Sequence, residues 1–88
     1  MSKVFKYPLP ISDVVEVVMP KDAKVLAVQV QNGTPCIWAA VNPTLEVETR
    51  TFRIAGTGHS IVDEIIDDYI GTFQLYDGQL VFHVFEIK

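Results

Sequence analysis

The chain has 88 residues, a net charge of −4 and a single cysteine. This length suits one domain, and the excess of acidic residues gives no general attraction for nucleic acid. Because a lone cysteine forms no internal disulfide, the domain depends on a core that buries about two-thirds of its unfolded surface. Apolar residues make up 49% of the chain. This is more than one small core needs, and it predicts burial between subunits in a homo-oligomer.

The N-terminal stretch MSKVFKYPLPIS lacks the apolar region of a signal peptide. No apolar run approaches the roughly 20 residues that a membrane-spanning helix requires. We therefore expect a cytoplasmic protein without a membrane partner, in which Cys36 is a small buried apolar residue rather than a reactive thiol.

Short runs rich in Val, Ile, Phe and Thr alternate with Gly and Pro along the chain, which is typical of an all-β domain. Asn32-Gly33 and Asp77-Gly78 separate such runs and predict tight hairpin turns, because these residues tolerate positive φ. The expected strands cover residues 3–9, 13–19, 24–31, 36–42, 46–56, 69–76 and 79–87. They predict a single domain over residues 1–88, a compact antiparallel β-sandwich or barrel of seven strands.

A two-residue turn at Asp77-Gly78 fixes how the last two strands pair. One face of this hairpin places Phe73 opposite Phe82 and is almost wholly apolar, so we expect it to face the core. The other face places Thr72 opposite His83. This face mixes polar and apolar residues, which suits a partly solvated groove or a contact between subunits.

The run SIVDEIIDDYI, residues 60–70, is ambiguous. Its isoleucines recur at helical spacing, and Ser60 and Asp63 have the spacing of a capping box. However, the run is short, rich in β-branched residues and leads directly into a strand. We expect a loop with at most one short helical turn near residues 61–67. Its carboxylates fit no calcium-binding loop and are interpreted as a solvated acidic segment.

The stretch FRIAGTGH carries the main candidate site. Gly56 and Gly58 allow the backbone to approach a ligand closely, Thr57 and His59 add hydrogen-bond donors, and Arg53 offers a forked cation suited to phosphate or carboxylate. The pattern favours a pocket for an anion or a nucleotide. The alternative is a glycine-rich turn that closes a strand, since the Lys-Ser/Thr pair of a P-loop is missing.

Trp38 and His83 complete the set of candidate ligand-binding residues. Trp38 is either a core anchor or an exposed platform on which a base stacks. His83, which neighbours Thr72 and Gln74 across the hairpin, is either a satisfied core residue or a ligand contact. Two histidines without a cysteine cluster predict no metal site. No catalytic set of Ser, Cys, His and Asp is visible either, so we expect no catalytic residue, no cofactor and no enzyme.

Several motifs spread along the chain resemble, as a set, one known family. They are KYPL, VQVQNGTPCIWAAV, FRIAGTGH, YIGTFQ and LVFHVFE, and they extend from Lys6 to Glu86. The set is similar to a family of short, mostly uncharacterised bacteriophage and prophage proteins. That family has no established activity, so no catalytic residue carries over. The resemblance implies a phage accessory protein made in the cytoplasm of the bacterial host.

The leading hypothesis is a non-enzymatic, oligomeric binding protein that captures an anionic small ligand. By analogy with small phage proteins that trap cyclic nucleotides, the most specific form of this hypothesis is that the ligand is a nucleotide signal of host antiphage defence. Arg53, His59 and the backbone of residues 56–58 would hold the phosphate, and Trp38 or Tyr76 would stack on the base.

Two alternatives belong to other classes of protein. The first is a virion accessory or host-protein-binding domain, which predicts an exposed apolar face. The residues expected on that face are Ile70, Val81, Phe85 and Ile87. The second is a small hydrolase or isomerase that uses His59 or His83.

Overall fold

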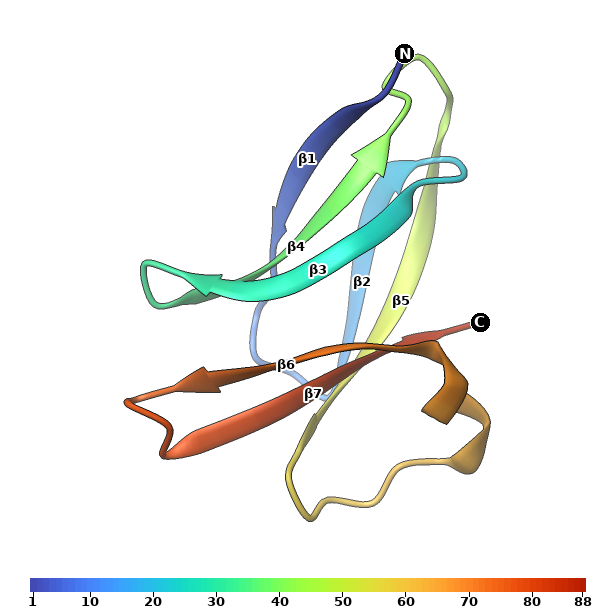
Figure 1. The fold of residues 1–88 in the computed structure, drawn as a ribbon. Coiled ribbons are helices and arrows are strands. Elements are labelled where there is room, and N and C mark those ends of the chain that lie inside the picture. Colours follow the sequence, from blue (N-terminus) through green and yellow to red (C-terminus); the bar gives the residue numbers. More distant parts are fainter.

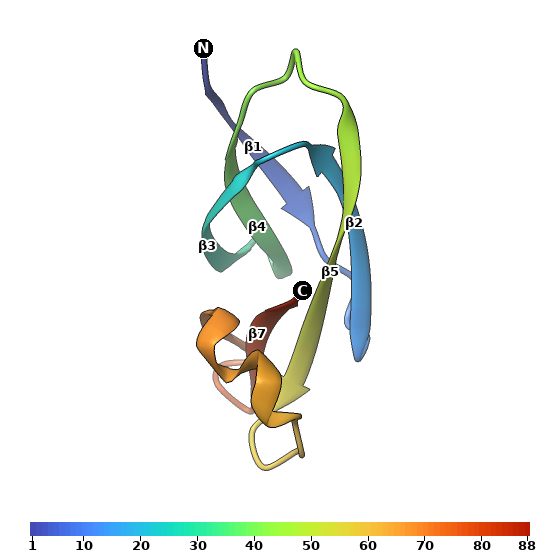
Figure 2. The same cartoon turned by 90° about the vertical axis from the view of Figure 1, so that its right-hand side faces the viewer.

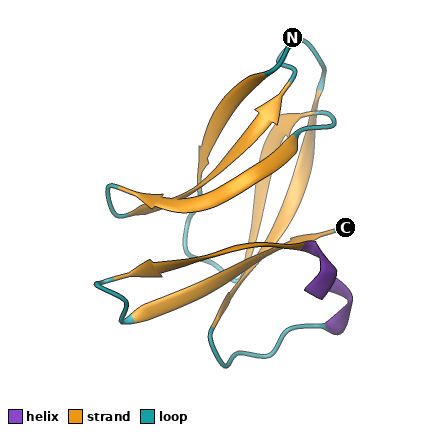
Figure 3. Ribbon diagram, in the orientation of Figure 1, coloured by secondary structure: helices purple, strands orange, loops and turns teal.

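The computed structural model describes residues 1–88 as seven strands in two antiparallel sheets, with one 3-10 turn before the sixth strand (Figure 3). The elements are β1 (Lys3–Pro8), β2 (Val14–Pro20), β3 (Lys24–Gln31), β4 (Thr34–Val41), β5 (Val47–Gly56), η1 (Asp63–Asp68), β6 (Tyr69–Leu75) and β7 (Leu80–Ile87). The all-β prediction is confirmed, and the open sheets decide for a sandwich against a closed barrel.

The strand order is β1-β4-β3 in the first sheet and β2-β5-β7-β6 in the second. Figures 1 and 2 show β1, β4 and β3 as one layer that faces β2 and β5, while the β6–β7 hairpin continues the second sheet beneath β3. The chain therefore passes from one sheet to the other between β1 and β2, between β2 and β3, and between β4 and β5.

The core lies between the two sheets. In β2, Val15, Val17 and Met19 are buried while the residues between them are exposed, which is the alternation of a strand with one face on a core. These side chains meet Phe52 of β5, which is fully buried. The remaining core residues are Leu9, Ala23, Val28, Ile37, Ala39, Val41, Ile54, Phe73 and Val84.

Both predicted hairpin turns are present, but the second loop is longer than the two residues predicted, because Tyr76 also has a positive φ of 53° and the strand pairing ends at Leu75 and Leu80. Asn32 and Gly33 have φ of 51° and 80°, and Asp77 and Gly78 have φ of 55° and 87°. Positive φ at both central residues is the geometry whose twist matches the flanking strands.

The predicted register of the last hairpin is confirmed. Phe73 pairs with Phe82 and Thr72 with His83. The two phenylalanine rings stack with centroids 5.4 Å apart, and Phe73 belongs to the core. The face that carries Thr72 and His83 points away from the first sheet and is called the outer face below.

A β-bulge interrupts this register near the start of β6. The pairing shifts between Tyr69 and Gly71, so Tyr69 lies opposite Phe85. The aromatic rings of these two residues meet edge to face at 5.6 Å.

The acidic segment contains the expected helical turn, η1, and Ser60 and Asp63 form no capping box despite their spacing. The N-cap residue is Val62 in an extended conformation, and no side chain caps the turn. Ile65 anchors the segment because its side chain is buried. No helical segment is long and apolar enough to cross a membrane.

Candidate functional site

The GTGH residues form a tight turn where the chain leaves β5. The Thr57 N–H donates to the Val81 carbonyl at 3.2 Å, and the His59 N–H donates to the Gly56 carbonyl at 3.0 Å. Gly58 adopts a φ of +89° at the tip, a conformation that residues with a Cβ rarely adopt. The turn is therefore fastened to β7 at its base.

A hollow of about 290 Å³ opens between this turn and the tip of the last hairpin. Its lining residues are Gly56, Thr57, His59, Gln79, Leu80, Val81 and Phe82. The polar lining consists of a hydroxyl, an imidazole and an amide, and the rest is apolar. Small-ligand sites begin at about 300 Å³ and combine an apolar lining with a few polar groups in this way. We call this hollow the GTGH hollow.

A second hollow of about 270 Å³ lies near η1 and has the opposite electrostatic character. Its lining residues are Val25, Asp67, Asp68, Tyr69, Ile70, Glu86 and Lys88. Three carboxylates against one ammonium repel an anion, whereas the GTGH hollow has no carboxylate in its lining.

Gly56 has a different role from the one that the sequence predicted. A Cβ at this position would lie 3.1 Å from Cε1 and 3.2 Å from Nδ1 of His59. Such contacts are tighter than side chains normally make. The absence of a side chain at Gly56 therefore makes room for the His59 ring, which in turn lines the hollow.

His83 joins the turn to the last hairpin through a chain of hydroxyl groups. Its Nε2 lies 2.7 Å from the Thr57 Oγ1, and its Nδ1 lies 2.9 Å from the Thr72 Oγ1. The Thr72 hydroxyl in turn lies 2.6 Å from the Tyr69 hydroxyl. Both ring nitrogens are thus satisfied, and His83 acts behind Thr57 rather than in the hollow itself.

Either neutral form of His83 gives a chain in which each group donates to the next. With the proton on Nε2, Tyr69 donates to Thr72, Thr72 donates to Nδ1, and Nε2–H donates to Thr57. The Thr57 hydroxyl then keeps its own proton for a ligand. With the proton on Nδ1, the direction reverses and Thr57 donates to the ring.

Arg53 does not line the GTGH hollow. Its guanidinium donates to the carbonyl groups of Ile54, at 2.6 Å, and of Asp13 and Ser60, each at 3.3 Å. It also lies 3.5 Å from the Asp13 carboxylate. These contacts tie the start of β2 to the segment after β5. Arg53 therefore holds the base of the turn, and it is not among the residues that line the hollow with His59.

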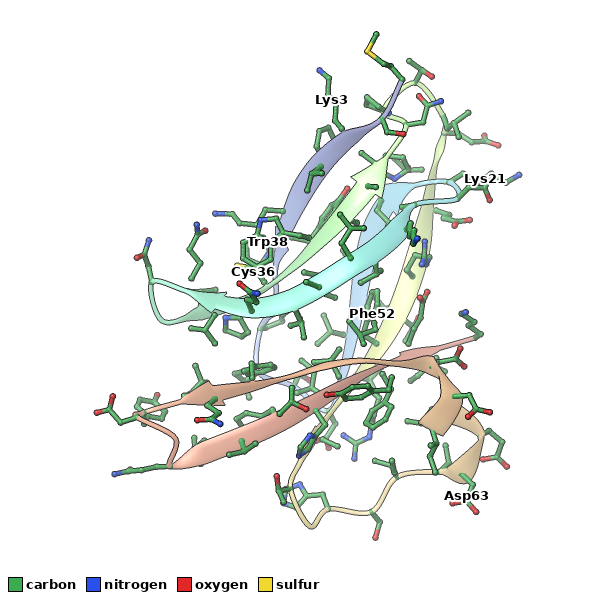
Figure 4. The ribbon with its side chains drawn as sticks, viewed as in Figure 1. Lys3, Lys21, Cys36, Trp38, Phe52 and Asp63 are labelled. Carbon is green, nitrogen blue, oxygen red and sulfur yellow. The ribbon has the colours of Figure 1, made fainter.

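Trp38 lies on the other sheet. It belongs to β4, where it pairs with Lys6 of β1 and Ala27 of β3, and it is half-buried. Figure 4 shows Trp38 on the first sheet, away from Asp63 and the segment that follows β5. Within one subunit, Trp38 therefore cannot stack on a ligand held in the GTGH hollow.

The apolar face expected for a protein partner is covered in part by the chain itself. The segment between β5 and β6 packs against the outer face of β7, where Phe85 and Ile65 are both buried. Phe85 is therefore not available on the predicted face, whereas Ile87 is 36% exposed and Val81 is half-buried.

The sequence interpretation missed Gln79, Leu80 and Phe82 as lining residues of the GTGH hollow. The sequence did contain part of this information, because the Asp77-Gly78 turn fixes the pairing of the last two strands and places Phe82 near the tip of the hairpin. The missing information was that Gly56 pairs with Phe82, a contact between strands far apart in the chain.

These features define a small β-sandwich with one candidate ligand site, a hollow free of carboxylates at one end of its second sheet. The chain belongs to the family described as "Domain of unknown function (DUF7352)", whose sequence profile matches residues 1–88. No match was found among curated proteins or solved structures. The family match covers the whole chain, as the motifs did, while the phage origin stays a prediction.

Proposed function

We propose that this domain is a non-enzymatic binding protein that captures an anionic small molecule in the GTGH hollow. The observation that carries this proposal is the lining of that hollow. A hydroxyl, an imidazole and an amide line it together with three apolar residues, and no carboxylate is among them. Such donors hold phosphate or carboxylate oxygens through hydrogen bonds.

His59 and Thr57 are the residues we assign to the anionic group. The Thr57 hydroxyl is positioned by His83 at 2.7 Å, and a proton on Nε2 leaves this hydroxyl free to donate to the ligand. Arg53 contributes indirectly, because it holds the Ser60 carbonyl beside the turn. The apolar part of the lining suits the flat part of a ligand, and it includes Phe82, whose ring also stacks on Phe73.

In its more specific form, the proposal is that the ligand is a nucleotide. The domain would then be a phage accessory protein that removes a signal of host antiphage defence. A nucleotide combines an anionic phosphate with a flat base, and both parts have counterparts in the lining of the hollow. Capture without turnover needs no general base. This agrees with the use of His83 to position a hydroxyl.

Native mass spectrometry with a panel of cyclic and linear nucleotides tests this proposal. We expect discrete mass increases for at least one nucleotide and release of the ligand intact on denaturation. Release of a hydrolysed ligand would contradict capture without turnover. Binding of no nucleotide on the panel would contradict the nucleotide form of the proposal and favour a protein partner.

Two variants test the hollow itself. His59→Ala removes the imidazole, and Gly56→Ala displaces the ring through the close contact described above. Both are expected to weaken binding about tenfold, the loss that follows from one or two hydrogen bonds. Gln79→Ala removes an amide that lines the hollow. Its control is Gln29→Ala, which makes the same change at an exposed residue of the first sheet. Equal affinities of these two glutamine variants would argue against this location.

Arg53→Lys separates a positioning role from a direct one. Lysine keeps the charge but lacks the fork that reaches several carbonyl groups. If Arg53 positions the turn, the variant weakens binding and also lowers the free energy of unfolding. Weaker binding at unchanged stability would instead place Arg53 in contact with the ligand.

A further inference from the structure

Strand β2 is an unpaired edge of the second sheet. It bonds to β5 on one side and has no neighbour on the other. It is seven residues long, its register with β5 is unbroken, and its sequence is VVEVVMP. An exposed, regular and apolar edge of this kind is a template for pairing with another strand.

The direction of the free backbone groups follows from the bonds that frame the strand. At one end, the Ile54 N–H donates to the Asp13 carbonyl at 3.0 Å, and at the other, the Lys21 N–H donates to the Glu46 carbonyl at 2.8 Å. Odd-numbered residues of β2 therefore point their N–H and C=O groups toward β5. Because these groups alternate along a strand, those of the even-numbered residues point outward.

The backbone groups that point outward are the N–H and C=O of Val14, Glu16 and Val18 and the C=O of Pro20. The side chains of Val14 and Val18 are also 51% and 56% exposed. Pro20 has no N–H, so it fits the end of an edge strand. Three donors and four acceptors are consequently available along one line.

The other sheet edges carry more protective features than β2 does. β1 contains Lys3, Lys6 and Pro8, and lysine and proline discourage strand addition. β3 has a break in register between Val25 and Ala27, and β6 has the bulge near Gly71. Bulges twist an edge away from a flat partner. On β2 only Glu16 and the terminal Pro20 act in this way.

We propose that β2 pairs antiparallel with β2 of a second copy of this chain, which joins the two four-stranded sheets into one. The two-fold axis passes at Val17. In this register Glu16 lies opposite Val18 of the partner subunit, and Val15 lies opposite Met19 of the partner subunit. All three outward N–H groups on each copy then meet an outward carbonyl group on the other.

This register is preferred for two reasons. A two-fold axis at Glu16 would place two carboxylates directly opposite each other, which destabilises a strand pair. With the axis at Val17, the whole length of β2 is used and the buried faces of the two sheets become continuous. The strand is thus complementary to itself, which is the requirement for a symmetric dimer.

Light scattering during size-exclusion chromatography, repeated over a wide concentration range, tests this proposal. We expect a reversible dimer of the 9.9 kDa chain. Val18→Pro removes one outward N–H from each copy and leaves the bonds to β5 intact, so it is expected to weaken association about tenfold or more. Val18→Thr keeps the N–H and is the matched control, with unchanged association.

A charge variant tests the register. Val18→Lys places an ammonium opposite Glu16 of the partner subunit. An edge lysine discourages unspecific strand pairing, but in the proposed register this lysine meets a carboxylate, so association is expected to tighten several-fold and to lose this gain in high salt. Leu26→Lys makes the same change at an exposed residue of β3 and is expected to leave association unchanged.

Amide hydrogen exchange on the unmodified chain gives a readout that does not depend on how the variants fold. The amides of Val14, Glu16 and Val18 are expected to become protected as concentration rises, while those of Val15 and Val17 are protected throughout. A chain that stays monomeric, or a dimer whose Val14, Glu16 and Val18 amides exchange freely, would overturn the proposal. Ligand binding in the GTGH hollow is measured separately, so neither proposal decides the other.

Discussion

Arg50 and Glu86 form the most enclosed ion pair of the domain. The Arg50 Nη2 lies 2.9 Å from the Glu86 Oε1, its Nε also donates to this carboxylate, and its Nη1 donates to the Ala23 carbonyl at 2.8 Å. The two side chains are only 17% and 10% exposed. The hydrogen bond to Glu86 raises the pKa of the Arg50 guanidinium above its ordinary value despite the opposing effect of burial.

Removal of one partner from this pair is expected to be costly. Glu86→Ala leaves the Arg50 charge buried without its partner, so the free energy of unfolding should fall by about 3 kcal/mol. Glu48→Ala serves as the control, because Glu48 is 40% exposed and lies 3.9 Å from Arg50. Its loss should cost at most about 0.5 kcal/mol. Urea unfolding of both variants measures the difference, and equal losses would contradict the assigned burial.

Tyr7 makes the free energy of unfolding depend on pH in the alkaline range. Burial raises the pKa of its phenol above the ordinary value of 10.0. Above that pH the unfolded chain loses the Tyr7 proton while the folded chain keeps it, so the free energy of unfolding falls as pH rises. Tyr7→Phe should reduce this fall, whereas Tyr76→Phe, at a residue that is 71% exposed, should not. Urea unfolding on both sides of pH 10.0 compares them.

At the scale of elements, the strands and hairpins could be predicted from the local sequence. Asn32-Gly33 and Asp77-Gly78 tolerate the positive φ that tight hairpin turns require, and the alternation of apolar residues sets the buried faces. The roles of Arg53 and Trp38 were less accessible. The contacts of Arg53 depend on the carbonyl groups of Asp13, before β2, and of Ser60, after β5. The surroundings of Trp38 depend on which sheet includes β4. Both depend on strand order, which a pattern of local runs does not contain.

The bulge in β6 has a packing consequence that a double substitution can expose. A Cβ on Gly71 would lie 2.7 Å from the Val28 Cγ1, where β6 passes close to β3. Gly71→Ala should therefore lower the free energy of unfolding by about 1–3 kcal/mol through overpacking. Val28→Ala makes room, so the double variant should lose less than the sum of the two single losses, by about 0.5 kcal/mol or more. Additive losses in urea unfolding would contradict this contact.

At the scale of the whole molecule, composition predicted the class of fold correctly but left sandwich and barrel open. The distinction depends on whether the edge strands meet. β2 and β6 end the second sheet on opposite sides, and nothing in the apolar alternation of either strand indicates what lies beside it. The surplus of apolar residues agrees with exposed valines on β2 and with the dimer proposed above.

The position of β7 has a consequence for how the chain reaches this structure. β7 comes last among the strands, yet it lies inside the second sheet, between β5 and β6. The second sheet therefore remains divided until β7 arrives, and the entropy of closing a long loop is lost before its contacts form. Domains built on such distant pairings fold in about milliseconds to seconds. Until β7 is inserted, β5 and β6 both present open edges, so folding intermediates are the forms of this chain most exposed to aggregation.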